Sequence, residues 1–232
     1  GVDTIAGIPI IELKRTRLEG WGGILKRLMD IIGAVFFLVT FSPIMLLAAI
    51  ATLIETGFPI IFRNERVGEN GRTFATLKFR SMYQHYSIGT QFKNQRKALA
   101  YEQELIATKN SKTGPLYKIQ DDPRITRVGR FLRRWSIDEL PQFFNVLSGS
   151  MSLVGPRPHQ IREVAGYAPE HREVHNVRPG ITGLAQISGR SDLSFEDEIR
   201  LDTFYIENWS LLMDIAILIK TPWAVLRRRK VE

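Results

Sequence analysis

The 232-residue sequence contains no cysteine. This absence excludes disulfide bridges, thiolate zinc sites and cysteine nucleophiles, and it fits a reducing compartment or a chemistry that needs no sulfur. The sequence also lacks the motifs HExxH, GxSxG, GxxxxGK(S/T) and GxGxxG. The common catalytic and phosphate-binding sites that these motifs mark are therefore not indicated.

Acidic residues are fewer than basic ones, 24 against 32, which gives a formal net charge of +8. This balance indicates an anionic partner, and nucleic acid, anionic lipid headgroups and a phosphorylated substrate all qualify. The length suits one compact domain with a small appendage.

Charged residues are missing from Ile31 to Ile54, a run rich in aliphatic and aromatic side chains. A helix of this length rises about 1.5 Å per residue and more than spans a hydrocarbon core of about 30 Å. The simplest interpretation is a single transmembrane helix. However, Pro43 in the middle of the run predicts a kink, and the Ser42 hydroxyl is a nearby donor for the carbonyls that the proline frees.

Basic residues flank this run on both sides, and the positive-inside rule favours the cytoplasmic side for each flank. They are Lys14, Arg15, Arg17, Lys26 and Arg27 before the run, and Arg63, Arg66, Arg72, Lys78 and Arg80 after it. A segment that breaks at Ser42-Pro43 and leaves by the face it entered satisfies both flanks. From the residues alone, this re-entrant hairpin and a straight span are equally favoured.

The rest of the chain predicts an α+β fold that is mostly helical. Turn signals between alternating apolar residues indicate a short hairpin over 59–83. Helices are expected over 91–110, 128–135, 138–147, 160–175, 195–208 and 211–229. The last of these carries an apolar stripe and a basic end, which suits either a helix on an anionic membrane surface or an ordinary helix that caps the core.

The segment from Ser136 to Pro141 carries two adjacent carboxylates, Asp138 and Glu139. Ser136 and Glu139 match a capping box, although the helix could instead begin at Pro141. Either way, the carboxylates lie near a helix N-terminus, and for an isolated motif the simpler interpretation is that they only complement the helix dipole. Five arginines that precede them favour a site for a divalent metal and phosphates: Arg124, Arg127, Arg130, Arg133 and Arg134.

Two later segments combine rigid turns with arginines. Gly155-Pro156-Arg157-Pro158 predicts a fixed turn, which is either a structural corner or a presented arginine. The stretch from Arg178 to Arg190 places three glycines between arginines. Such a loop lets backbone amides approach a diphosphate, although glycines alone are weak evidence.

Taken in order, these segments resemble the bacterial sugar transferases, the monotopic polyprenyl-phosphate phosphoglycosyl transferases that initiate exopolysaccharide, O-antigen and glycan assembly. The resemblance covers about residues 23–232. Its motifs are Lys26–Asp30, Ser42-Pro43, Arg66–Gly68, Lys78–Met82, Asp122–Thr126, Asp138-Glu139, Met151–Pro158 and Arg178–Arg190.

The resemblance implies a site and a reaction. Asp138 matches the nucleophile and Glu139 its partner, and the basic residues Lys78, Arg133, Arg157 and Arg190, with Gly155, match substrate-binding positions. The reaction implied is a transfer of sugar phosphate from a UDP-sugar to polyprenyl phosphate through a covalent aspartyl intermediate, with Mg²⁺ bound near Asp138.

The resemblance also implies the organisation of the chain. Residues 1–22 resemble a linker after an additional N-terminal domain, 23–58 a re-entrant membrane helix that now outweighs the straight span, and 59–232 the catalytic domain. The expected location is the cytoplasmic face of the bacterial inner membrane. An insertion near residues 84–118 is either a flap or an oligomer contact, so a homodimer is one possible assembly. The resemblance does not identify the sugar.

Three other functions were weighed against this one. A membrane-tethered nucleic-acid binder fits the charge, but the arginines gather around carboxylates and glycines rather than in a recognition motif, so no nucleic-acid partner is expected. An inactive scaffold for polysaccharide assembly is disfavoured by the intact Asp138-Glu139 pair. A lipid diphosphate phosphatase shares the nucleophile and differs in using water as the acceptor.

Overall fold

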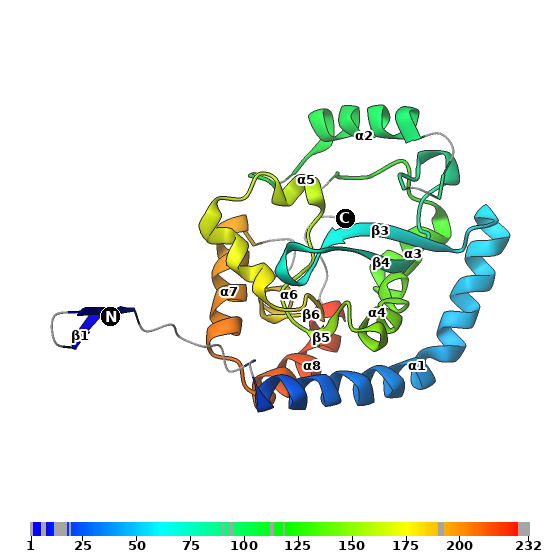
Figure 1. Cartoon of the computed structure of the whole chain (residues 1–232). Coiled ribbons are helices and arrows are strands. Elements are labelled where there is room, and N and C mark those ends of the chain that lie inside the picture. The colour runs from blue at the N-terminus through cyan, green and yellow to red at the C-terminus, as the bar shows by residue number, and fades with distance from the viewer. Residues whose placement is uncertain are drawn as a thin grey trace.

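Figure 1 shows the computed structural model of the chain, in which one long helix runs along two sides of an α+β domain. The structure describes residues 2–5, 8–11, 18, 20–89, 91–92, 95–111, 114–117, 119–189 and 193–226.

Along the chain, short strands and 3₁₀ turns alternate with helices. They are β1 Val2–Ile5, β2 Ile8–Ile11, α1 Trp21–Thr56, β3 Ile61–Val67, η1 Glu69–Gly71, β4 Thr73–Phe79, η2 Gln84–Tyr86, α2 Gln95–Lys109, α3 Arg127–Arg134, η3 Ile137–Glu139, α4 Gln142–Ser148, β5 Ser152–Val154, α5 Ile161–Val164, η4 Pro169–Asn176, β6 Gly180–Thr182, α6 Leu184–Ser188, α7 Phe195–Glu207 and α8 Leu211–Leu226.

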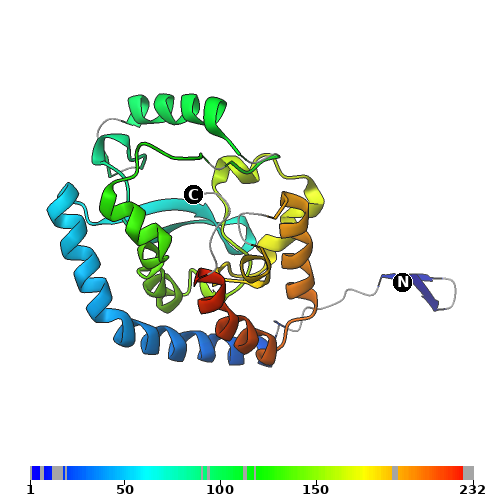
Figure 2. The same cartoon turned by 180° about the vertical axis from the view of Figure 1, so that it is seen from behind.

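Helix α1 contains the whole uncharged run and has Pro43 in its interior. Proline removes the donor that would bond the carbonyl four residues earlier, which is that of Val39. The Ser42 hydroxyl donates to this same Val39 carbonyl at 2.8 Å. The hydroxyl therefore satisfies the acceptor that the proline leaves free, as the sequence predicted. Figures 1 and 2 show that the helix turns within its length, so that its two parts follow adjacent sides of the domain.

Both ends of α1 are bonded to the same domain. Near its start, Lys26 Nζ lies 2.8 Å from Asp214 Oδ2 of α8, and Arg27 donates to the carbonyls of Val146 and Leu147. At its end, the Arg80 guanidinium donates to the carbonyl of Thr56. The helix is thus fastened to the domain before and after its apolar run.

The largest hydrophobic core forms where α1, α4, β5, α7 and α8 meet. Ala34 on the inner side of α1, Val146, Met151 and Val154 are completely buried in it. Phe37 of α1 stacks on Phe143 of α4 with ring centroids 5.2 Å apart. A small alanine and stacked rings allow the helix to pack closely on the domain over its first half.

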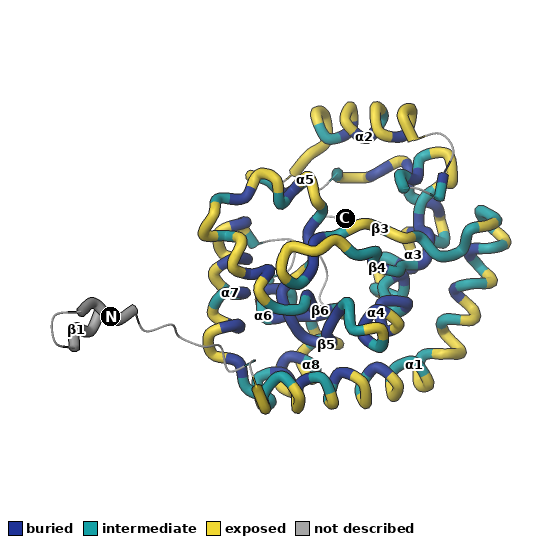
Figure 3. Tube along the Cα trace, viewed as in Figure 1, coloured by how far each residue is buried: buried dark blue, intermediate teal, exposed yellow. Residues whose placement is uncertain are grey.

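The outer side of α1 is exposed, as the yellow segments along the helix in Figure 3 show, and its exposed side chains are mostly apolar. Exposed side chains on it include Ile24, Ile32, Phe36, Val39, Leu46 and Leu47. Within the described part of the chain, α1 is the one helix that is long and apolar enough to cross a membrane. Helix α8 shares this character, because Ile219 and Trp223 are more than two-thirds exposed while Asp214 and Ile217 face the core.

The sheets are small, and each described sheet pairs two strands. Strands β3 and β4 form an antiparallel hairpin in which Phe62 faces Lys78 and Arg66 faces Phe74. This hairpin confirms the one expected over 59–83. Strands β5 and β6 pair in parallel, which the sequence did not indicate.

The predicted helices are mostly confirmed, and the α+β, largely helical class with them. Helices α2, α3, α7 and α8 lie within two residues of the predicted bounds wherever the structure describes them, except at the start of α2. The helix predicted over 160–175 is wrong: α5 ends at Val164, and a 3₁₀ helix begins at Pro169. Gly166 and Pro169 fall inside the predicted span, and each disfavours a continuous helix.

Candidate active site

Asp138 and Glu139 lie in η3, a single 3₁₀ turn between α3 and α4. The capping box proposed for Ser136 does not form, because Ser136 adopts a left-handed conformation at φ 55° and its side chain caps no amide. Helix α4 begins after Pro141 instead, which is the alternative that the proline suggested. The 3₁₀ turn leaves Asp138 only 7% exposed.

Glu139 is ion-paired across the site with Lys78. Lys78 Nζ on β4 lies 2.6 Å from Glu139 Oε1, and both side chains are at least two-thirds buried. This bond joins the strand to the turn that carries Asp138. The structure therefore brings together three of the residues predicted for the site: Lys78, Asp138 and Glu139.

Arg133 approaches the same region from α3. Its Nε donates to the Ser81 hydroxyl at 2.7 Å, which holds the guanidinium beside the residues that follow β4. Arg133 also lines a cavity of about 1150 Å³ that lies between β3, α2, α3 and α5. This volume exceeds that of a typical small-molecule pocket.

The cavity wall is rich in arginine. Its basic lining residues are Arg63, Arg66, Arg124, Arg130, Arg133, Arg134 and Arg162. Apolar and aromatic groups, among them Phe62, Leu99 and Tyr117, line other parts. A recess that combines clustered guanidinium groups with apolar surface suits a phosphorylated ligand that also has a ring to bury.

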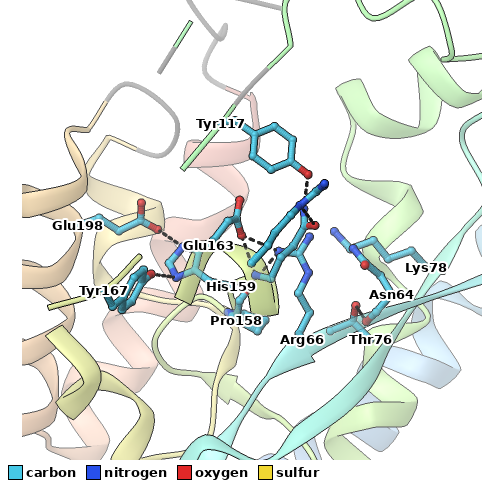
Figure 4. A network of polar contacts seen from close by, with 12 residues as sticks. Asn64, Arg66, Thr76, Lys78, Tyr117, Pro158, His159, Glu163, Tyr167 and Glu198 are labelled. Atoms are coloured by element: carbon cyan, nitrogen blue, oxygen red, sulfur yellow. Dashed lines mark hydrogen bonds and ion pairs between the residues drawn. The ribbon is translucent and has the colours of Figure 1, made fainter. Parts of the chain in front are cut away.

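Arg66 belongs to this site, although the sequence analysis gave it no role there. It donates to the Pro158 carbonyl at 3.3 Å and pairs with Glu163 Oε2 at 3.5 Å, as Figure 4 shows. Burial lowers the pKa of Arg66 to about 10, partly offset by Glu163, so it stays a cation at neutral pH. The sequence could have indicated this role for Arg66. In a hairpin that turns near Gly68, Arg66 on β3 and Lys78 on β4 lie on the same face of the sheet.

Arg157 stands in the predicted rigid turn after β5, among carboxylates. Desolvation acts to lower its pKa, but the carboxylates of Glu198 and Glu139 outweigh it and raise the pKa above the ordinary arginine value. Arg157 is therefore within electrostatic reach of Glu139. The turn carries Arg157 as an exposed side chain, and its role in substrate binding stays a prediction.

A buried histidine supports this turn from behind. His159 Nδ1 lies 2.6 Å from the Tyr167 hydroxyl, and its Nε2 lies 3.4 Å from Glu198 Oε1. Figure 4 shows His159 between these two partners and next to Pro158. No local pattern in the sequence indicates this group, because its members are spread over 40 residues and meet only in the fold.

Gly180 of the predicted diphosphate cradle contacts Gly155 of the predicted rigid turn. The Gly155 amide donates to the Thr182 carbonyl at 2.9 Å, and the Gly180 amide donates to the Pro156 carbonyl at 2.8 Å. A Cβ on Gly180 would lie 2.1 Å from the Gly155 nitrogen. Because neither glycine has a side chain, the backbones of β5 and β6 can pack closely against each other. Gly155 therefore has a packing role in the structure. Arg190 lies outside the described residues.

Arg124 is one of the five arginines predicted to form a phosphate site, but in the structure it is paired with two carboxylates. It is 3% exposed and binds Asp122 through Nε and Nη2, while its Nη1 lies 3.1 Å from Glu102 of α2. This buried network ties α2, within the insertion near 84–118, to the domain. Arg124 is therefore committed to structure.

The carboxylates fit a magnesium ion only together with a substrate. Among the residues that the structure describes, no three His, Cys, Asp or Glu side chains gather as a metal site. Mg²⁺ commonly uses one or two carboxylates and completes its shell with water and substrate phosphates. Asp138, with Glu139 beside it, supplies this minimal set.

Comparison with known proteins gives the site its context. The sequence model of the family described as "Bacterial sugar transferase" matches residues 21–228. The exopolysaccharide production protein ExoY of Sinorhizobium fredii is 42% identical over 88% of this chain and 86% of its own length. The UDP-galactose-lipid carrier transferase of Erwinia amylovora is 41% identical over 88% of this chain.

A third relative is the UDP-glucose:undecaprenyl-phosphate glucose-1-phosphate transferase of Escherichia coli K12, 37% identical over 95% of this chain. The chain spans most of the Sinorhizobium protein, but only 41% of the Erwinia protein and 44% of the Escherichia protein.

Proposed function

Because this chain belongs to the bacterial sugar transferase family, we propose that it transfers a sugar 1-phosphate from a UDP-sugar to a polyprenyl phosphate such as undecaprenyl phosphate. The observation that carries the proposal is the buried Asp138 beside Glu139, which is ion-paired with Lys78. Arg66 of β3 and Arg133 of α3 line an arginine-rich cavity. The names of the relatives, which specify UDP-sugars and lipid carriers, support the proposal.

The reaction proceeds in two displacements at one phosphorus atom. A carboxylate oxygen of Asp138 attacks the phosphorus that carries the sugar, and the bond from this phosphorus to the UMP oxygen breaks, so UMP leaves. A phosphate oxygen of the lipid then attacks the same phosphorus and displaces the aspartate. The carboxylate is regenerated, and the product is a polyprenyl diphosphate sugar.

The neighbouring residues prepare the site for anions. Lys78 and Arg66 face the turn from the hairpin, while Arg133 and Arg157 approach from α3 and the turn after β5. Fixed cations in a partly buried recess stabilise charge on a diphosphate without reorganising during the reaction. Glu139 keeps Lys78 in place, and its negative charge offsets part of the positive field around the nucleophile.

Asp138, with Glu139, would also hold Mg²⁺. The ion would neutralise charge on the diphosphate oxygens and make the UMP phosphate a better leaving group. The adjacent carboxylates and the need for substrate oxygens to complete the shell support this role. Removal of the ion with EDTA should therefore suppress UMP release, and added Mg²⁺ should restore it.

The membrane arrangement proposed is re-entrant, at the cytoplasmic face of the bacterial inner membrane. Both ends of α1 are bonded to one domain, through Lys26 and Asp214 at the start and Thr56 and Arg80 at the end. A helix that crossed the bilayer would separate its ends by the full membrane thickness. The kink at Pro43 and the exposed apolar outer side support a helix that dips into one leaflet.

Cysteine labelling tests this arrangement, because the chain has no cysteine of its own. Trp21→Cys and Phe58→Cys are at positions 86% and 71% exposed on either side of the run. A membrane-impermeant maleimide should label both positions in inverted vesicles and neither in intact spheroplasts. Labelling of the two positions from opposite sides would establish a straight span instead.

The activity itself is tested with purified protein in nanodiscs with Mg²⁺. UDP-glucose, UDP-galactose and N-acetylated UDP-sugars are offered one at a time, with undecaprenyl phosphate, and released UMP is measured. We expect UMP release with at least one donor and a matching lipid-linked sugar. Folded protein that releases no UMP with any donor would favour the alternative of an inactive scaffold for polysaccharide assembly.

A further inference from the structure

We propose that the last turn of α1 positions Lys78 relative to Asp138 and Glu139, with Glu55 and Arg80 as the positioning residues. Glu55, Thr56, Gly57 and Arg80 form the contact between the C-terminal end of α1 and the domain, and this group is termed the joint. The inference rests on the proposed function, since it assigns residues that align the site of that reaction.

Arg80 fastens the end of α1 to β4. Its Nη2 lies 2.6 Å from the Thr56 carbonyl, 2.7 Å from the Thr56 hydroxyl and 2.8 Å from the Gly57 carbonyl. Its own amide donates to the Ile60 carbonyl at 2.8 Å, so it extends the β3–β4 ladder. Lys78, the partner of Glu139, lies two residues earlier on the same strand.

Arg80 holds this position at an energetic cost. The residue is 2% exposed, and within the described structure its Nε and Nη1 have no hydrogen-bond partner. Burial of the guanidinium lowers its pKa. Unsatisfied polar atoms of a buried cation destabilise a fold, so the three bonds to α1 are better explained by alignment than by stability.

Glu55 fastens the same turn to α3. Its carboxylate accepts from the amides of Arg127 and Val128 at 3.0 to 3.2 Å. These are the first two residues of α3, whose helix N-terminus favours an anion. At its other end, α3 carries Arg133 and leads directly into the turn with Asp138.

Strand β4 and helix α3, which both contact the joint, are also hydrogen-bonded to each other. The Thr126 amide donates to the Ser81 carbonyl at 3.1 Å, and Arg133 donates to the Ser81 hydroxyl at 2.7 Å. A Cβ on Gly129 would lie 2.0 Å from the Ser81 carbonyl oxygen. Helix α3 therefore touches the end of β4 backbone to backbone, and neither can shift independently.

The residues of the proposed site come from both of these elements. Lys78 comes from β4, whereas Glu139 and the nucleophile follow α3. A displacement of the joint would change the distance between them, and a misplacement of about 1 Å can lower a rate by about 10²-fold. The membrane helix thus sets the geometry of the reaction through its last turn.

Kinetics of four variants in nanodiscs test the proposal: Glu55→Ala, Glu55→Gln, Arg80→Gln and the double variant Glu55→Ala with Arg80→Gln. We expect Arg80→Gln and Glu55→Ala to lower kcat for UMP release by about 10- to 100-fold. KM for the UDP-sugar should stay within about twofold, because neither residue lines the cavity. Glu55→Gln keeps one acceptor oxygen and should recover most of the activity.

Two control variants and a double-mutant cycle distinguish a loss of alignment at the site from a general loss of folding. Glu104→Ala on α2 and Arg200→Gln on α7 remove exposed charges outside the joint and the site, and they should leave kcat unchanged. The double variant should lose less than the product of the two single losses, because both act through one joint. Fully multiplicative losses, or unchanged kcat in both single variants, would overturn the proposal.

A distance measurement tests the joint without turnover. Spin labels at Ile54→Cys and Phe131→Cys, which are 81% and 56% exposed, report the separation of α1 from α3. We expect a narrow distribution that broadens with Glu55→Ala but not with Glu104→Ala. An unchanged distribution in an impaired Glu55→Ala variant would also overturn the proposal. A wild type that releases no UMP would refute the proposed function, while the distances would still report on the joint.

Discussion

Replacing Asp138 by asparagine should lower kcat/KM for UMP release by at least about 10³-fold, because an amide has the size of the carboxylate but is a far weaker nucleophile. Asp138 is 7% exposed in a short turn, and an isosteric change there should leave the melting temperature nearly unchanged. The measurement is UMP release in nanodiscs with the preferred UDP-sugar, with Asp138→Ala included because asparagine can revert by deamidation.

The matched comparison is Glu139→Gln, next to the nucleophile in the same turn. This change removes the anion that lies 2.6 Å from Lys78 and should cost about 10²-fold, since the nucleophile itself is intact. An Asp138→Asn variant that stays within tenfold of wild type, or that loses less than Glu139→Gln, would contradict the assignment of Asp138 as the nucleophile.

Removing the buried carboxylate of Asp214 should cost about 3–5 kcal/mol of stability. Asp214 is 0% exposed and accepts from Lys26, Tyr205 and Trp209 at 2.7 to 3.1 Å. In Asp214→Ala, the one partner that the Lys26 cation keeps among the described residues is Asp30 at 3.8 Å, and two further buried donors lose this acceptor. We expect the loss in thermal or denaturant unfolding of the nanodisc-reconstituted protein, with Glu207→Ala on the surface of α7 as the control.

A second variant distinguishes charge from packing. Lys26→Met combined with Asp214→Leu removes both charges and should recover much of the loss, because the desolvation of an unpaired cation is avoided. Stability of Asp214→Ala within about 0.5 kcal/mol of wild type would show that the pair does not fasten α1 to α8.

The sequence predicted those features that local rules determine. Pro43 and Ser42 indicated both the kink and the donor that compensates it, because the proline and its freed carbonyl lie within one helical turn. Helix α4 ends at Ser148, one residue beyond the predicted limit of 147, because Gly149 adopts a left-handed conformation at φ 86°. The hairpin of β3 and β4 followed from its turn residues.

Features that depend on distant contacts were not accessible in the same way. Arg124 resembled its arginine neighbours in the sequence, yet Asp122 and Glu102 bury it in a structural network. Gly180 was predicted in a diphosphate cradle and Gly155 at a substrate-binding turn, but in the structure the parallel pairing of β5 and β6 requires both residues to be small. The roles of Glu55 and Arg80 depend on where α1 ends relative to α3, and no local pattern encodes that distance.

The central claim is that Asp138 carries the phosphosugar during the reaction. We would incubate the protein with Mg²⁺ and its UDP-sugar without lipid acceptor, quench in acid, and determine the intact mass and the modified peptide. The account predicts one hexose-phosphate adduct on the peptide containing Asp138, with one UMP released per protein and no adduct in Asp138→Asn. The account would be contradicted by a protein that forms lipid-linked sugar but releases UMP only when the acceptor is present and shows no adduct at any time.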